Sequence, residues 1–259
     1  MQRFHAVRRA DGEFFGTEPV WKILLRIAPP VMLAQLIQAL YNVVDSFFVG
    51  RFSGDGLTAL SVIYPIQLII TALAVGTGVG VNTQMSRLYA KGRTEAANKT
   101  GGAGILLALV MWALFTAIIL PILRPFSEAS ATSPAAVEDA VVYGTICCAG
   151  SVGVFCESIF SKIHQARGNM LLPMIAQIAG ALVNIVLDPV LIFGWGAIPQ
   201  MGVAGAAWAT VLGQVTAAVI TGVRGFRKPP ALRRIWRYVK RILLLGYPSI
   251  LMQAMYTVY

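Results

Sequence analysis

Residues 181–193 read Ala181-Leu-Val-Asn-Ile-Val-Leu-Asp-Pro-Val-Leu-Ile-Phe193, an apolar run that contains one amide and one carboxylate. Asn184 and Asp188 are four residues apart, so a helix places both side chains on one face. Pro189 cannot donate a backbone hydrogen bond to Ile185, which leaves that carbonyl free one turn earlier. A carboxylate within hydrocarbon is costly and is kept mainly for function. This stretch therefore predicts a membrane helix that carries a binding site.

The composition of the whole chain is that of a membrane protein. Of its 259 residues, 57% are hydrophobic and 12% are charged, whereas soluble domains are about a quarter charged. A bilayer crossing needs roughly 20 apolar residues. Seven stretches qualify: 23–49, 57–84, 101–123, 139–160, 170–194, 203–223 and 242–259. The predicted fold class is an all-α polytopic membrane protein. Because the sequence has no Walker loop, catalytic triad or His/Cys metal cluster, we expect no enzyme, no cofactor and no structural metal.

The basic residues predict an orientation in the membrane. All but two of the 21 Lys and Arg residues fall in the N-terminal segment or in alternate connections between spans, the exceptions being Arg51 and Arg124. The positive-inside rule makes those connections cytoplasmic, which places the N-terminus in the cytoplasm of a multi-pass cell (inner) membrane protein. The net charge of +10 is then held at the membrane face. We therefore expect the lipid bilayer, and no nucleic acid, as a partner.

A weak internal repeat suggests a second bundle. Residues 22–41 and 240–259 align at a constant offset, with Lys, Leu, Pro, Gln and Tyr residues matched. Repeated bundles are common in secondary transporters, where the substrate site lies between the halves. We expect a cytoplasmic segment over 1–22, a six-helix N-lobe over 23–223, a basic cytoplasmic inter-lobe loop over 224–241, and the start of a seventh transmembrane helix over 242–259. On this interpretation the chain is an N-terminal fragment that lacks its C-terminal lobe.

Polar residues on three different spans share a depth in the bilayer. At 1.5 Å of rise per residue, Asp45, Asn184, Asp188 and Thr210 all fall in the outer half. Two carboxylates that meet there can bind H⁺, and an added amide and hydroxyl complete a set of oxygen ligands for Na⁺. We predict that these four residues bind a coupling cation. The alternative is that each polar group pairs with the backbone or with a neighbouring helix.

The first span carries a polar stripe. Gln38, Tyr41, Asn42 and Asp45 recur at spacings of three and four residues, and Gln67 on the second span is a weaker candidate for the same region. Such a stripe lines either a cavity or a helix contact, and we predict a substrate cavity here. These residues by themselves indicate an ion-coupled membrane transporter.

Glu157 stands apart from the other acids. It lies near the inner end of the fourth span, where it could extend to the interface or pair with Lys162. Its role stays open.

Several separated motifs occur together over nearly the whole chain: Gly16-Thr-Glu-Pro-Val-Trp-Lys22, Gln38-Ala-Leu-Tyr-Asn-Val-Val-Asp-Ser-Phe-Phe-Val-Gly50, Ser86-Arg-Leu-Tyr-Ala-Lys-Gly92, Gln165-Ala-Arg-Gly-Asn169, Asn184-Ile-Val-Leu-Asp-Pro189 and Gly202-Val-Ala-Gly-Ala-Ala-Trp-Ala-Thr210. Their order resembles that of the multidrug and toxic compound extrusion (MATE) transporters. The resemblance implies twelve helices in two six-helix lobes. It also implies export of drugs or toxins, often cationic amphipathic compounds, in exchange for H⁺ or Na⁺ by alternating access.

The resemblance is to the DinF-like branch of that family. In this branch an Asp on the first helix and an Asn-x-x-x-Asp pair on the fifth form the coupling site, which matches Asp45, Asn184 and Asp188. A Thr on the sixth helix belongs to the proposed Na⁺ site and matches Thr210. The NorM-like branch places an acid on the seventh helix, and no acid lies within 248–259 here.

Two alternatives to a drug antiporter stay open. One is a lipid-linked precursor flippase of the same superfamily, which would need basic groups around a pyrophosphate. The spans show no buried Lys or Arg, which disfavours that function. The other is an uncoupled channel or a membrane scaffold. A channel would show flux that a proton or sodium gradient does not change, and a scaffold would show no flux.

Overall fold

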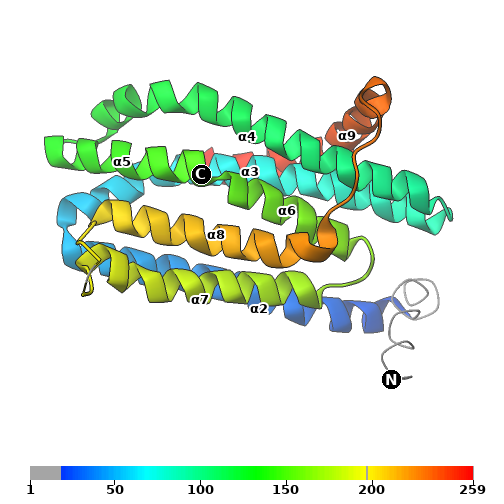
Figure 1. Ribbon diagram of the computed structural model, residues 1–259, viewed down its shortest axis with the longest axis horizontal. Coiled ribbons are helices and arrows are strands. Elements are labelled where there is room, and N and C mark those ends of the chain that lie inside the picture. The colour runs from blue at the N-terminus through cyan, green and yellow to red at the C-terminus, as the bar shows by residue number, and fades with distance from the viewer. Residues whose placement is uncertain (1–18, 197, 259) are drawn as a thin grey trace.

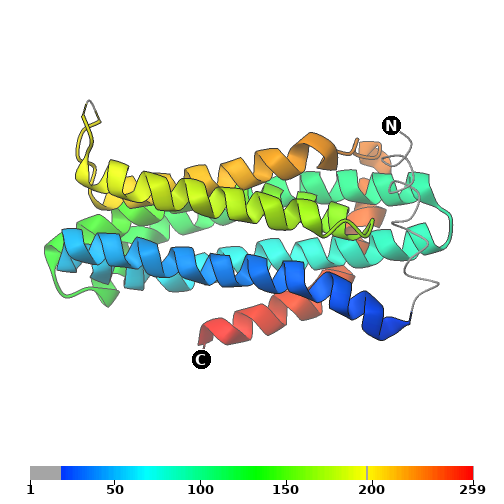
Figure 2. The same cartoon turned by 90° about the horizontal axis from the view of Figure 1, so that it is seen from below.

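The computed structural model describes residues 19–196 and 198–258. Within these ranges the chain folds into α2 (Val20–Phe52), α3 (Gly54–Ala90), α4 (Thr94–Ser130), α5 (Pro134–Gly150), α6 (Val152–Gln165), α7 (Leu171–Phe193), α8 (Val203–Gly225) and α9 (Leu232–Val258). The helices α2, α3, α4, α7 and α8 run roughly parallel to one another as one bundle, and α9 is inclined to them (Figures 1 and 2). The β structure of the described residues is a single isolated bridge between Trp195 and Ile198. The predicted all-α class is confirmed.

Six segments of the described chain are long and apolar enough to cross a membrane. They coincide with the first six predicted spans, and α5 and α6 together form the fourth. The protein is therefore a multi-pass membrane protein. The helix α9 does not meet the same length and composition criterion, so the seventh span remains a prediction.

The predicted loop over 224–241 is wrong in its second part, because α9 already begins at Leu232. This stretch alternates basic and apolar residues with the period of a helix. Val239 and Ile242 are buried against the core, while Trp236 is exposed. A single helix can thus hold a basic face at the membrane surface and an apolar face against the bundle. Most of the predicted segment over 1–22 lies outside the described residues.

The helix α3 occupies the middle of the bundle, where it packs against α4, α5, α6 and α9. Its face toward α9 is made of glycines. A Cβ atom at Gly80 would overlap the carbonyl oxygen of Ile242, and one at Gly76 would overlap the side chain of Ile250. Gly246 of α9 lies in the same contact. Small residues four apart let two membrane helices approach closely, so α9 lies directly on the backbone of α3.

We expect Gly80→Ala to loosen the α3–α9 contact and destabilise the protein by about 1–3 kcal/mol, since the added methyl group overpacks against a backbone atom. Thermal unfolding of the purified protein in detergent measures this loss. Gly54→Ala is the matched control, because a Cβ atom at Gly54 has no neighbour within 4 Å. Equal melting temperatures for the two variants would contradict the close packing.

The first turns of α2 are inclined to the rest of that helix in the view from below (Figure 2). Pro29 and Pro30 lie inside α2, where each removes one backbone hydrogen bond and bends the helix. The remainder of α2 lies along α7, and this contact positions the site described below.

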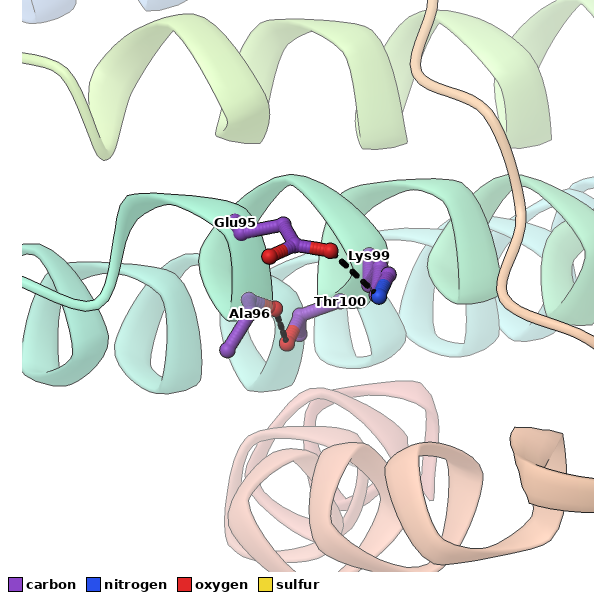
Figure 3. Close-up of polar contacts among 4 residues, drawn as sticks. All are labelled: Glu95, Ala96, Lys99 and Thr100. Atoms are coloured by element: carbon purple, nitrogen blue, oxygen red, sulfur yellow. Dashed lines mark hydrogen bonds and ion pairs between the residues drawn. The ribbon is translucent and has the colours of Figure 1, made fainter.

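The start of α4 carries an ion pair at the surface of the bundle. Lys99 Nζ donates to Glu95 Oε1 at 2.6 Å, and Thr100 Oγ1 donates to the carbonyl oxygen of Ala96 at 2.9 Å (Figure 3). The Glu and Lys are four residues apart on an exposed turn. Exposed pairs of this kind contribute little to stability, because water and salt screen their charges. Glu95 and Lys99 are thus two charges that are bonded directly to each other at the surface.

Candidate functional site

A cavity of about 480 Å³ lies inside the bundle. Its walls come from α2, α3, α5, α6, α7 and α8, and Gln253 of α9 completes them. The lining contains both polar and apolar side chains, which suits amphipathic molecules. The four residues that the sequence assigned to a substrate cavity all line it: Gln38, Tyr41, Asn42 and Gln67.

Two hydrogen bonds tie the predicted cavity residues into its wall. Gln38 Nε2 donates to the Tyr41 hydroxyl at 3.2 Å, and Gln67 Nε2 donates to the Tyr143 hydroxyl at 3.2 Å. The sequence did not single out Tyr143, which sits on α5 and is buried. No signal in one sequence distinguishes it from a core tyrosine, because its role depends on facing Gln67 across the bundle.

At one end of the cavity the structure brings together the four residues predicted to bind a cation. Asp45, Asn184, Asp188 and Thr210 are all buried. Asn184 Nδ2 lies 3.3 Å from Asp188 Oδ1 and 3.4 Å from Thr210 Oγ1. Asp45 lies on α2, which packs along α7, the helix that carries Asp188. Three helices thus contribute carboxylate, amide and hydroxyl oxygens to one small volume.

Several oxygens of this cluster have no hydrogen-bond partner in the described structure. They are Asp45 Oδ1, Asn184 Oδ1 and Asp188 Oδ2. A buried polar oxygen without a partner costs about 1–3 kcal/mol, and more when it is charged. Three such oxygens on three neighbouring residues form an acceptor set that suits a proton or a hard cation. The described residues contain no group of three or more His, Cys, Asp or Glu side chains that could hold a metal ion.

Close contacts between α7 and α8 create this cluster. A Cβ atom on Gly180 would lie 2.6 Å from the carbonyl oxygen of Gly213, and a Cβ atom on Gly213 would lie 3.2 Å from Asn184 Cβ. The two glycines therefore bring the backbones together next to Asn184. This approach lets the short Asn side chain reach Thr210 on the neighbouring helix.

Aromatic contacts hold α2 against α7 near the same end. Phe193 of α7 meets Phe48 at a ring distance of 6.4 Å and Phe52 at 6.2 Å, both edge to face. Aromatic pairs in this geometry contribute about 0.5–1.5 kcal/mol beyond burial of their area. They fix the end of α2 so that Asp45 faces the cluster on α7.

The helix α7 runs without a break from Leu171 to Phe193, through Pro189. The proline therefore does not end the helix, although it still provides no amide hydrogen for Ile185.

The part of the cavity wall formed by α6 carries two charged residues: Glu157, whose role the sequence left open, and Lys162. The predicted end of the fourth span at residue 160 is therefore too early, because Lys162, which the sequence placed in a connection, lies within α6 and is half-buried. That error arose because hydropathy ends a span at its first charges, whereas the helix continues to Gln165. The spacing of Glu157, Ser158, Ser161, Lys162 and Gln165 on one helical face was the available signal.

Comparisons with known proteins point to one group. The family model described as MatE matches residues 30–190. The chain is 27% identical over 239 residues to the probable multidrug resistance protein NorM of Thermotoga maritima, covering 88% of this chain and 50% of the relative. It is 29% identical over 216 residues to the multidrug export protein MepA of Staphylococcus aureus, covering 80% and 45%. It is 27% identical over 207 residues to the FAD transporter of Shewanella oneidensis, covering 79% and 45%.

Solved structures agree with these relatives. A multidrug resistance MATE family transporter of the MOP superfamily, in an outward-facing conformation, matches with a TM-score of 0.80 and 29% identity over 90% of this chain and 52% of its own. A crystal structure of MATE in complex with MaL6 matches with a TM-score of 0.81 and 29% identity over the same shares. The chain spans about half the length of the curated relatives and solved structures that it matches.

Proposed function

The chain belongs to the MatE family, whose model matches most of its length, and we propose on that premise that it serves in a secondary active multidrug efflux transporter. Drugs or toxins, often amphipathic cations, would leave the cell in exchange for H⁺ or Na⁺. The names of the multidrug relatives support this substrate class. The proposal places the protein in the cell (inner) membrane with its N-terminus in the cytoplasm, as the basic connections indicate.

The observation that carries the proposal is the set of unpartnered buried oxygens on Asp45, Asn184 and Asp188. Asp45 and Asn184 also line the cavity, so a cation held there touches the same wall as a bound drug. A scaffold without transport would gain nothing from burying two carboxyl groups in hydrocarbon. This arrangement supports a coupling role for Asp45, Asn184, Asp188 and Thr210.

The proposed mechanism is alternating access. A cation entering from outside would bind between Asp45 on α2 and Asp188 on α7, replacing charge repulsion by attraction across that contact. Asp45 and Asp188 lie where α2 packs along α7. Nearer its N-terminus, α2 is weakened by Pro29 and Pro30. Tightening it would repack α2, shrink the cavity and release the drug outward.

The charge of the cavity wall favours a drug exporter over a flippase. The ionisable Asp, Glu, Lys and Arg residues that line it within the described structure are Asp45, Glu157 and Lys162. One Lys facing two acids is a poor site for a pyrophosphate, which binds best to several basic groups. The cavity therefore does contain one basic residue, Lys162, but its two acidic residues still disfavour a flippase.

The test is drug exchange in proteoliposomes that contain the protein as its gene encodes it. Efflux of rhodamine 123, a permanently cationic dye, is measured under a proton gradient alone and under a sodium gradient alone. We expect at least one gradient to drive efflux, and the effective gradient identifies the coupling ion. Flux that is unchanged by either gradient would support a channel and overturn the proposal.

A further inference from the structure

The wall of the cavity formed by α6 holds an acid and a base that the cation cluster does not use. Glu157, Ser158, Ser161, Lys162 and Gln165 all line the cavity. Asp45 belongs to the other cluster and is the only other charged Asp, Glu, Lys or Arg in the described lining. The cavity therefore presents one carboxylate and one ammonium group along a single helical face.

The charges of Glu157 and Lys162 attract each other, but the described side chains form no ion pair within 4 Å of each other. Instead, Ser161 Oγ donates to Glu157 Oε1 at 2.5 Å, and Lys162 Nζ donates to Gln165 Oε1 at 3.0 Å. Each charge is thus held by a neutral partner. The Glu95–Lys99 pair differs, since its charges meet directly at 2.6 Å on the surface (Figure 3).

The surroundings of Lys162 fix its aliphatic stem. A Cβ atom at Gly78 would lie 2.8 Å from Lys162 Cγ and 2.9 Å from Ser158 Oγ, so the side chain lies against the bare backbone of α3. Ser158 Oγ donates to the carbonyl oxygen of Ala74 at 2.9 Å, which fastens α6 to α3 beside it. With its stem held, Lys162 presents its ammonium group at a defined place on the wall, and little side-chain entropy is lost when a ligand binds there.

Two opposite charges separated along a wall recognise a ligand that carries the complementary pair. A cation alone would satisfy Glu157 and meet repulsion from Lys162, and an anion alone would meet the reverse. A ligand with both charges satisfies both groups, and each charge-assisted hydrogen bond is stronger than a neutral one. Selectivity arises because a ligand lacking one charge leaves a half-buried group without its partner.

We propose that Glu157 and Lys162 form a subsite for zwitterionic amphiphiles, in which Glu157 takes the ammonium group and Lys162 the carboxylate of the ligand. This inference rests on the proposed transport function for its biological use, and it names a substrate class for the same cavity. The subsite acts in addition to the cation cluster, because it lies on α6 and shares no residue with Asp45, Asn184, Asp188 or Thr210.

The experiment compares two dyes that differ by one ester group. Rhodamine 110 carries a free carboxylate and is a zwitterion, whereas rhodamine 123 is its methyl ester and only a cation. Their binding to the purified protein in nanodiscs is measured by fluorescence anisotropy, which does not depend on transport. The variants are Lys162→Gln, Glu157→Gln and Lys162→Arg, with Lys99→Gln and Glu95→Gln as matched controls on the exposed pair.

We expect Lys162→Gln to weaken binding of rhodamine 110 about tenfold and to leave binding of rhodamine 123 unchanged or stronger, because the cationic dye loses only repulsion. Glu157→Gln should weaken both dyes about tenfold, because both carry the cationic ring system. Lys162→Arg should retain binding of rhodamine 110, and both control variants should bind the two dyes like the unmodified protein. A purely structural effect of Lys162→Gln would weaken the binding of both dyes alike.

Three results would overturn the inference: equal effects of Lys162→Gln on the two dyes, no effect of Glu157→Gln on rhodamine 123, or no binding of rhodamine 110 by the unmodified protein. The second result would indicate a site for anions instead. The transport proposal is judged separately by gradient-driven efflux of rhodamine 123, so a coupled exporter without dye selectivity would refute this inference alone.

Discussion

Asp188→Asn is expected to lower drug/cation exchange severely while leaving the protein folded in the membrane. Asp188 is fully buried on α7, and its Oδ1 accepts a hydrogen bond from Asn184. Its Oδ2 has no partner in the described structure. Asparagine keeps the volume of the side chain but removes the negative charge that a cation would meet. Because a charge-assisted bond is worth about 1.5–3 kcal/mol, we expect exchange to fall by roughly tenfold to a hundredfold or more.

Exchange of rhodamine 123 in proteoliposomes, at matched protein content, measures this effect. Asp139→Asn is the control, since it makes the same chemical change at a residue of α5 that does not line the 480 Å³ cavity. Asp45→Asn should behave like Asp188→Asn, because both carboxyl groups would contact the cation. Exchange at the unmodified rate in both Asp45→Asn and Asp188→Asn would remove the coupling role from this cluster.

Gly180→Val is expected to destabilise the protein and to remove its response to the coupling cation. A Cβ atom here would lie 2.6 Å from the carbonyl oxygen of Gly213 and 3.2 Å from Ala217 Cβ. Valine adds two further methyl groups, so α7 and α8 must separate. Overpacking of this kind costs about 1–3 kcal/mol. The separation would also draw Asn184 away from Thr210, a contact that is already 3.4 Å long.

The melting temperature of the purified protein measures both consequences. It is recorded in sodium chloride and in choline chloride at equal ionic strength, and again at lower pH, so that ion binding is separated from salt screening. The unmodified protein should be stabilised by the ion that couples transport, and Gly180→Val should lose this shift. Gly50→Val is the control, because a Cβ atom at Gly50 makes only an ordinary contact of 3.5 Å with Leu57. An intact ion-dependent shift in Gly180→Val would contradict the role of the α7–α8 contact.

Periodicity and hydropathy predicted the cation cluster in part. Asn184 and Asp188 could be placed on one helical face because a helix repeats every 3.6 residues. Their depth could be matched to Asp45 and Thr210 by counting rise along each span. The hydrogen bonds of Asn184 to Asp188 and Thr210 agree with that matching, while the cation-binding role of the cluster remains a prediction.

The same reasoning failed where charge and helix coincide. Hydropathy ended the fourth span before Lys162 and began the seventh after the basic residues of 224–241. In the structure α6 continues to Gln165 and α9 begins at Leu232. A helix tolerates charged residues when its apolar face is packed elsewhere, and hydropathy averaged over a window cannot see which face that is.

The amino-acid sequence by itself determined the class of the protein, its six membrane-capable segments, and which acidic residues lie within them at an energetic cost. These follow from local properties, namely apolar length and helical period. Only the tertiary structure decided which polar atoms have partners. Asn184 bonds to Thr210, Asp188 Oδ2 has no hydrogen-bond partner among the described residues, and Glu157 accepts a hydrogen bond from Ser161. The physical reason is that these distances depend on how closely separate helices approach. That approach is set by glycines such as Gly180 and Gly213 meeting across a contact between segments far apart in the chain.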